Sequence, residues 1–210
     1  MPLFQVYRGH AAGFGANSSP PARQTTFGDL VVASFYQAMI LDGRGYQVRA
    51  GTVTTPLTAD VLITDTAAEM CADAVAGTTL MPVFMQIDIE ALGGPLPQVA
   101  AKSVATVSSS GTAFTPLPLK SDGAAAVSTA RVAATGATTV TAELATTTVV
   151  HYIRTLAVAA DVQAIWEPVA APVLVGARCF YVQVASVTTG STYFGNFNYL
   201  EMPTLLVVPS

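Results

Sequence analysis

The chain has few charged residues. Asp, Glu, Lys and Arg make up 10% of its 210 residues, against about 25% in an ordinary soluble domain. Its nine Lys and Arg residues are scattered and the formal net charge is −4. The sequence therefore lacks the cluster of cations with which proteins neutralise nucleic-acid phosphates, and we expect no direct nucleic-acid binding.

Long hydrophobic runs are also missing, although 51% of the residues are hydrophobic. The longest run, LVVASFYQAMIL at 30–41, is interrupted by Gln37 and is shorter than the roughly 18 residues of a membrane-spanning helix. The first 15 residues contain no apolar segment of the kind that a secretory signal needs. We expect neither membrane association nor export by that route, and we expect the apolar surface to be buried in a core and between subunits.

Residues that commonly carry chemistry are scarce. Cys71 and Cys179 lie far apart without metal-ligand spacing, which predicts two buried free thiols. His151, in VVHYIR, is expected to be a structural residue of a strand, and Trp166 a core or interface residue rather than a carbohydrate platform. No GxSxG motif and no GK[ST] loop is present. We therefore predict no catalytic residues, no cofactor, no metal and no enzymatic activity.

Acidic residues form the strongest charge feature. Between Arg49 and Lys102 the sequence has no cation and six carboxylates: Asp60, Asp65, Glu69, Asp73, Asp88 and Glu90. The spacing of Asp65, Glu69 and Asp73 places them on one face of a predicted helix, and Asp88 and Glu90 share one face of a strand. Such oxygens suit Ca²⁺, but the absence of a DxDxDG loop favours an exposed, solubilising face.

The first part of the chain contains an arm, a hairpin and a helix in our interpretation. Residues 1–28 are rich in glycine, proline and small polar residues and predict an extended arm; residues 29–210 form one domain. The apolar runs 30–41 and 46–54 flank DGRG, which predicts a hairpin. In 64–77, alanines, a capping box of Thr66 with Glu69, and a terminal Gly77 predict a helix.

The remaining segments predict strands. Residues 79–92 and 179–186 alternate in hydropathy, 101–109 form a short strand, and the Ala-, Thr- and Val-rich segment 127–163 holds two or three more. Eight to ten strands at spacings of about ten residues predict a sandwich. The predicted fold class is all-β: a single jelly-roll or β-sandwich with one short helix and an extended N-terminal arm.

The stretch STYFGNFNYLEM, residues 191–202, gathers aromatics in a chain that has few of them. The run Thr192 to Phe197 resembles the last strand of tumour necrosis factor and C1q-type jelly rolls, where the aromatics help to form a trimer axis. The resemblance implies a homotrimer. By strand alternation it also implies an oligomer interface formed by Tyr193, Gly195, Phe197 and Tyr199, beside a gap at the glycine.

The composition of the whole chain, rich in Ala, Thr and Val and poor in charge and cysteine, with a Gly- and Pro-rich arm, is similar to that of jelly-roll virion proteins of bacteriophages. This resemblance implies a structural virion protein, a capsid or capsid-decoration subunit whose partners are its own copies and other virion proteins. The acidic balance favours a decoration or outer-layer position, since the arm holds only Arg8 and Arg23 as cations. The alternative is an extracellular trimeric recognition module, either of the tumour necrosis factor/C1q kind or a carbohydrate-binding head.

Overall fold

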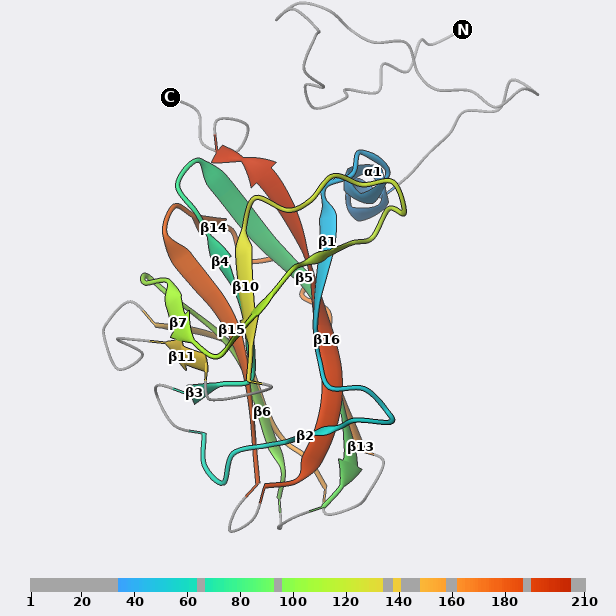
Figure 1. Ribbon diagram of the computed structural model, residues 1–210, viewed down its shortest axis with the longest axis vertical. Helices are drawn as coiled ribbons and strands as arrows, with labels where there is room; N and C mark the ends of the chain where they lie inside the picture. The colour runs from blue at the N-terminus through green and yellow to red at the C-terminus, as the bar shows by residue number, and fades with distance from the viewer. Residues whose placement is uncertain are drawn as a thin grey trace, which may run out of the picture.

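The computed structural model describes residues 34–63, 67–92, 96–133, 138–140, 148–157, 162–186 and 190–204. The predicted arm, residues 1–28, lies outside these ranges, as does most of the final segment 204–208. Two large antiparallel sheets face each other, with the helix α1 (Phe35–Leu41) at one end of the sandwich (Figure 1). Within the described ranges, no helix is both long and apolar enough to cross a membrane.

Each sheet contains four long strands and shorter additions. The first has the order β13 (Val162–Trp166), β5 (Thr78–Ala91), β16 (Thr192–Pro203), β1 (Gly45–Ala50) and β9 (Leu117–Pro118), with β14 (Leu174–Val175) on β5 and β2 (Leu57–Thr58) on β16. The second has the order β12 (Val149–Thr155), β6 (Gln98–Val104), β15 (Arg178–Ala185), β4 (Met70–Ala74), β10 (Thr129–Val132) and β8 (Thr112–Phe114). A small third sheet, β3 (Ala67–Ala68), β11 (Thr138–Val140) and β7 (Ser108–Ser110), lies outside the second (Figure 1).

The pairing of the long strands defines the topology. In chain order they are β1, β4, β5, β6, β12, β13, β15 and β16. The first pairs with the last, the second with the seventh, the third with the sixth and the fourth with the fifth, all antiparallel. Because β16 also pairs with β5, and β15 with β6, each sheet holds four strands of this set. This is the strand order of a jelly roll, so the predicted fold class is confirmed.

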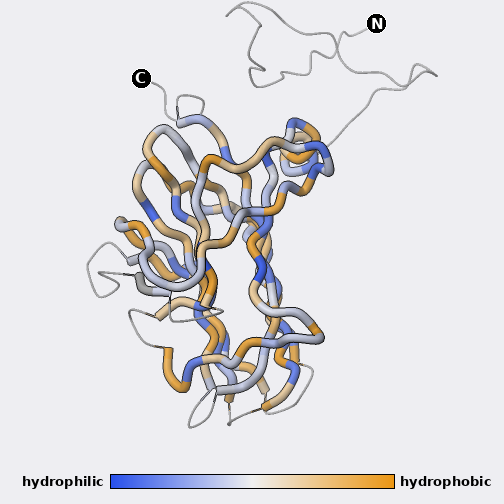
Figure 2. Tube along the Cα trace, in the orientation of Figure 1, coloured by the Kyte–Doolittle hydropathy of each residue, from blue (hydrophilic) through white to orange (hydrophobic). Residues whose placement is uncertain are grey.

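Aromatic rings fill the space between the sheets. Trp166 stacks on Phe180 at 5.7 Å between ring centroids, and Phe180 meets the edge of Phe197 at 5.2 Å. The series continues through Tyr199 to Tyr46, with centroid distances of 6.1 and 5.8 Å. In β5, hydrophobic residues that face this core alternate with residues of the outer face, and Figure 2 shows the hydropathy along the chain.

The helix α1 occupies part of the run 30–41, where we predicted a strand. The side chain of Ser34 accepts a hydrogen bond from the Gln37 amide at 3.2 Å and so caps its first turn. Gly43, with φ +77°, ends it, and its amide donates to the carbonyl of Ile40. The predicted hairpin at DGRG is therefore wrong, since β1 pairs with β16 and β9 instead.

The predicted helix at 64–77 is wrong: β3 and β4 occupy the described part of it. Strand β4 is paired on both sides, with β15 and β10. Helix propensity is a weak prior that such pairing overrides, and the segment also carries a period of two. Met70 faces the core with Ala72, whereas Cys71 and Asp73 face the other way. Gly77, with φ +83°, marks the turn that leads from β4 into β5.

The alternating strands were predicted correctly. In β5, Met85, Ile87 and Ile89 are fully buried and the residues between them are half-buried. In β15 both faces are buried, because the third sheet covers the outer one. That cover explains why strand β15 lacks an exposed face.

Candidate functional site

The predicted interface strand, β16, lies in the middle of its sheet. The rings of Tyr193, Phe197 and Tyr199 are 0% exposed and belong to the core of the single chain. A Cβ built on Gly195 would lie 2.6 Å from the backbone oxygen of Gln86 and 2.5 Å from Cδ1 of Ile87, so the gap beside this glycine is filled by β5. A subunit interface through these four residues stays a prediction; the contacts that the structure shows for them are internal.

Exposed apolar side chains gather at one edge of the sandwich. Strands β12 and β13 are the edge strands of the two sheets, and the rings of His151 and Trp166, one from each, lie 6.3 Å apart. On β12, Val149, Val150 and Ile153 are 49%, 54% and 64% exposed. We call this strip, with Ile165 of β13 and with Val169 and Val173 beyond it, the apolar edge; all six side chains are exposed.

Sequence reasoning did not identify the apolar edge. Its signal is present in VVHYIRT, where two adjacent valines and an isoleucine share a strand with one charged residue, Arg154. A strand buried on one face alternates, and this one does not. The missing information was position within the sheet, because the sequence does not show that this strand is the last of its sheet and lies at the edge of the sandwich.

A buried carboxylic acid lies between the sheets at the opposite end from α1. Glu69 accepts a hydrogen bond of 2.7 Å from the hydroxyl of Tyr193 and one of 3.3 Å from the amide of Asp60. Burial raises the pKa of Glu69 to about 7, against the lowering effect of the Tyr193 hydroxyl. The pKa of Tyr193 is itself raised by burial and by the neighbouring Glu69. Strand β16 is thus joined to the segment that leads into β4.

A second carboxylate fixes the other end of β16. Glu201 accepts hydrogen bonds from the backbone amides of Val127 at 2.9 Å and Ser128 at 2.8 Å. The Ser128 hydroxyl is 2.7 Å from that of Tyr199. Burial raises the pKa of Tyr199. This group holds the segment before β10 across the sandwich and satisfies backbone donors that would otherwise be buried without partners.

His151 is satisfied within the fold, as predicted. It is the extra residue of a bulge in β12, where the pairing register with β6 shifts between Val150 and Tyr152. Its Nε2 lies 2.8 Å from Oγ of Ser103, and its ring packs against Trp166 and Phe180. Burial lowers the pKa of His151. Trp166 is 8% exposed, which agrees with the predicted core role and not with a carbohydrate platform.

Of the two predicted acidic faces, the structure contains one and not the other. Asp88 and Glu90 do share one face of β5, where Asp88 accepts hydrogen bonds from Gln86 and Gln163 at 2.9 and 2.7 Å. The helical face is wrong because the segment forms strands. Glu69 points to Tyr193 in the core and Asp73 to Ser108 in the third sheet, while Asp65 lies outside the described residues.

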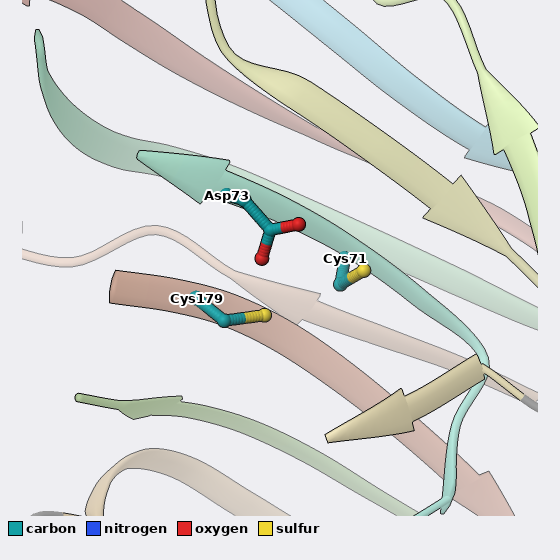
Figure 3. A group of neighbouring side chains, drawn as sticks. All are labelled: Cys71, Asp73 and Cys179. Carbon is teal, nitrogen blue, oxygen red and sulfur yellow. The ribbon is translucent and has the colours of Figure 1, made fainter. Parts of the chain in front are cut away.

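Both cysteines are buried and free, as predicted, but they are neighbours. Asp73 on β4 is directly opposite Cys179 on β15, and Cys71 precedes Asp73 by two residues on the same face. The two sulfurs and a carboxylate oxygen lie within 4.8 Å of one another (Figure 3). Burial, followed by the nearby Cys71 and Asp73, raises the pKa of the Cys179 thiol well above its usual range. Cross-strand register brings together a group that sequence spacing did not reveal.

No protein-family model and no curated protein sequence matches the chain. Among solved structures, it is similar to a chain of "Infectious Bursal Virus Derived T=1 Particles" at 15% identity and a TM-score of 0.22. The alignment covers 78% of this chain and 41% of that one, so this chain spans about two fifths of the length of the viral chain. At that TM-score the likeness carries no argument, and the fold described above rests on its own strand pairing.

Proposed function

We propose that the chain is a structural virion protein, a bacteriophage capsid or capsid-decoration subunit that self-assembles through apolar surfaces of its jelly roll. The observation that carries the proposal is the apolar edge. Its six exposed side chains lie on consecutive segments, together with only Arg154 and Glu167 as charged residues among the described positions of 148–175. Apolar patches of this kind mark surfaces that are buried against another protein.

The backbone of the same edge supports assembly. Strand β12 pairs with β6 alone, and β13 with β5 alone, among the described residues. Edge strands usually avoid pairing with other chains through lysines, prolines or a covering loop. Strand β12 contains no lysine and no proline, and the protective features that its described residues show are one arginine, Arg154, and the bulge at His151. It therefore offers unpaired backbone groups beside β-branched side chains, which suit antiparallel addition of a strand from a second copy.

The size of a stable interface indicates how much more surface must take part. A typical interface buries about 800 Å² on each partner and uses about 20–30 residues a side. The apolar edge is smaller than that, so we take it as the centre of the contact and the neighbouring polar residues as its rim. A homotrimer is the proposed unit, and other virion proteins and the virion are its proposed partners and location.

A non-catalytic role fits the buried polar groups. Ser103 and His151 have the spacing of a nucleophile and a base, but Ser103 is 3% exposed and its hydroxyl lies inside the sandwich. Glu69 and Glu201 are each occupied by donors of the chain itself. These groups hold segments of the jelly roll together, which is a structural role.

The test is assembly of a variant that carries charge at the apolar edge. We expect the wild type to form oligomers in size-exclusion chromatography with light scattering, and Val150→Asp/Ile153→Asp to reduce them to monomers with an unchanged unfolding midpoint. The matched control is Val53→Asp, because Val53 is 66% exposed in the turn formed by residues 52–55, away from this edge. A wild type that stays a monomer at every concentration, or a double variant that assembles like the wild type, contradicts the proposal.

A further inference from the structure

Three donor groups converge beneath the third sheet. Cys71 and Asp73 project from β4 and Cys179 from β15, on the face turned away from the main core. Figure 3 shows the three side chains on the same side of these two strands. Both cysteines are 0% exposed and Asp73 is 2% exposed, and Ala68 of β3 packs over the same cluster. The only two cysteines of the chain thus meet in a buried layer beside a carboxylate.

The donor set suits a zinc ion better than it suits a calcium ion or a disulfide. Zinc binds thiolate and carboxylate at about 2.3 and about 2.0–2.2 Å, which places two sulfurs about 3.8 Å apart in a tetrahedral site. Donors already within 4.8 Å reach that geometry through a shift of about 1 Å, which side-chain rotation provides. Calcium prefers oxygen ligands alone.

A disulfide is disfavoured by the register. Cys71 is opposite Tyr181, and Cys179 is opposite Asp73, so the two cysteines occupy diagonal positions of the strand pair. Diagonal Cα atoms in an antiparallel pair are about 7–8 Å apart, beyond the roughly 4.4–6.8 Å that a disulfide spans. A metal ion can bridge this separation because two sulfur–metal bonds span a longer distance than one sulfur–sulfur bond.

The surroundings of the carboxylate resemble a supporting shell. Asp73 accepts hydrogen bonds from the Ser108 amide at 2.8 Å and from the Ser108 hydroxyl at 2.6 Å. These bonds fix the orientation of the carboxylate, as outer-shell partners do for metal ligands. They also place the Ser108 hydroxyl of β7 beside the cluster, as an outer-shell partner of the carboxylate. The ion would therefore join β4 to β15, and the hydrogen bonds between Asp73 and Ser108 would connect the site to β7 of the third sheet.

Two cations lie on the same face of the sheet as the three donors. Arg131 of β10 is opposite Cys71, and Lys102 of β6 is opposite Tyr181, so both belong to this face of the sheet. The Arg131 guanidinium donates to the carbonyl of Ser110 at 3.1 Å, toward β7. Zinc binding releases one proton from each thiol. Two thiols and one carboxylate carry a charge of −1, and two thiolates, one carboxylate and Zn²⁺ carry the same, so the buried charge does not change.

We propose that Cys71, Asp73 and Cys179 bind a zinc ion that joins β4 to β15 beneath the third sheet. The site is separate from the apolar edge, so its test is independent of the assembly test. Its consequence is local: the ion links β4 and β15 beneath the third sheet, whose strands are only two or three residues long.

The direct test uses the whole wild-type chain, purified under reducing conditions without chelator. We expect one zinc per chain by elemental mass spectrometry, and we expect Co²⁺ to replace it with the absorption bands of cobalt–thiolate coordination. Removal of zinc with a chelator should lower the unfolding midpoint, and added zinc should restore it. A folded wild type that holds no stoichiometric zinc and gives no cobalt–thiolate bands overturns the proposal, as does an intact mass two hydrogens lower, which would identify a disulfide.

Variants then assign the ligands. Cys71→Ser and Cys179→Ser should each abolish the cobalt–thiolate bands, and Ser108→Ala should weaken zinc affinity by about 10- to 100-fold, as expected of an outer-shell partner. The matched control is Ser186→Ala, a buried hydroxyl paired with Ser191 elsewhere in the fold, which should bind zinc as the wild type does. If a cysteine variant fails to fold, the wild-type titration decides alone. Full retention of zinc by a folded Cys71→Ser or Cys179→Ser protein contradicts the assignment.

Discussion

Strands β16 and β12 place their apolar side chains in opposite ways. Strand β16 lies between β5 and β1, and its largest rings, those of Tyr193, Phe197 and Tyr199, are wholly buried. Strand β12 lies at an edge, and its valines and isoleucine are about half exposed or more. The aromatic strand therefore packs the core of the chain, whereas the aliphatic strand leaves apolar surface exposed, which in our proposal a second copy covers. Position in the sheet, and not side-chain size, separates the two roles.

The comparison is tested most strongly by truncating one side chain from each strand. Phe197→Ala should lower the free energy of unfolding by about 3–5 kcal/mol, because it removes a ring packed on Phe180 and Tyr199 and leaves a cavity. Ile153→Ala, on β12, should change it by less than about 0.5 kcal/mol, as at other exposed positions. Urea denaturation of both variants measures the difference. Similar losses would mean that the two strands are not distinct in role.

A bulkier residue at the glycine of β16 should come next in effect. Gly195→Val should destabilise the fold by about 3 kcal/mol, because its Cβ would overlap the backbone oxygen of Gln86 and the Ile87 side chain. An oligomer interface at Gly195, as the resemblance implies, would instead predict that this change disrupts an oligomer before the fold. Thr155→Val on β12 is the control, since Thr155 is exposed at an edge. A folded Gly195→Val protein that loses only its oligomers would restore β16 as the interface.

A pH-dependent difference should follow from the acid that β16 covers. The pKa of Glu69 is about 7 in the folded chain and 4.5 ordinarily. Between these values the folded state binds more protons than the unfolded state, so the free energy of unfolding falls as pH rises through this window. At pH 8, Glu69→Gln should therefore be more stable than the wild type by about 2–3 kcal/mol, and near pH 4 the two should agree.

Denaturation curves of Glu69→Gln and wild type at pH 4, 6 and 8 provide the measurement. Glu90→Gln serves as the control, because Glu90 lies on the half-buried outer face of β5 rather than in the core. An equal slope of stability against pH in the wild type and in Glu69→Gln would show that another group causes the dependence.

The regular part of the fold follows from the sequence where alternation is clear. Strands β5 and β15 carry a period of two that survives any tertiary context, so they could be predicted with their faces. The segment 64–77 could not, because alanine suits both helix and strand, and pairing with β10 and β15 decided the outcome. The helix α1 was missed because polar residues do not recur at helical spacing within its apolar run. Only the Ser34 cap and Gly43 mark its limits.

The candidate sites depend on register, which sequence spacing does not encode. The proximity of Cys71 to Cys179 requires the exact pairing of β4 with β15, and that of Glu69 to Tyr193 requires two segments from different sheets to meet. The exposure of Ile153 requires that β12 be the last strand of its sheet. Each of these features depends on which strands lie side by side in the folded chain. Composition nevertheless excluded a basic nucleic-acid surface, because that needs clustered cations whatever the fold.

The pairing of the first long strand with the last has a consequence for synthesis. Gly45 pairs with Leu200, and β5 also depends on β16 for its neighbour, so the first sheet has a gap at its centre until residues 192–203 have left the ribosome. Contacts of such long sequence separation form late and slowly. A chain that terminates early therefore never closes its sandwich and never presents a finished edge strand. The topology thus acts as a check on synthesis, because only a chain that includes residues 192–203 can complete the first sheet.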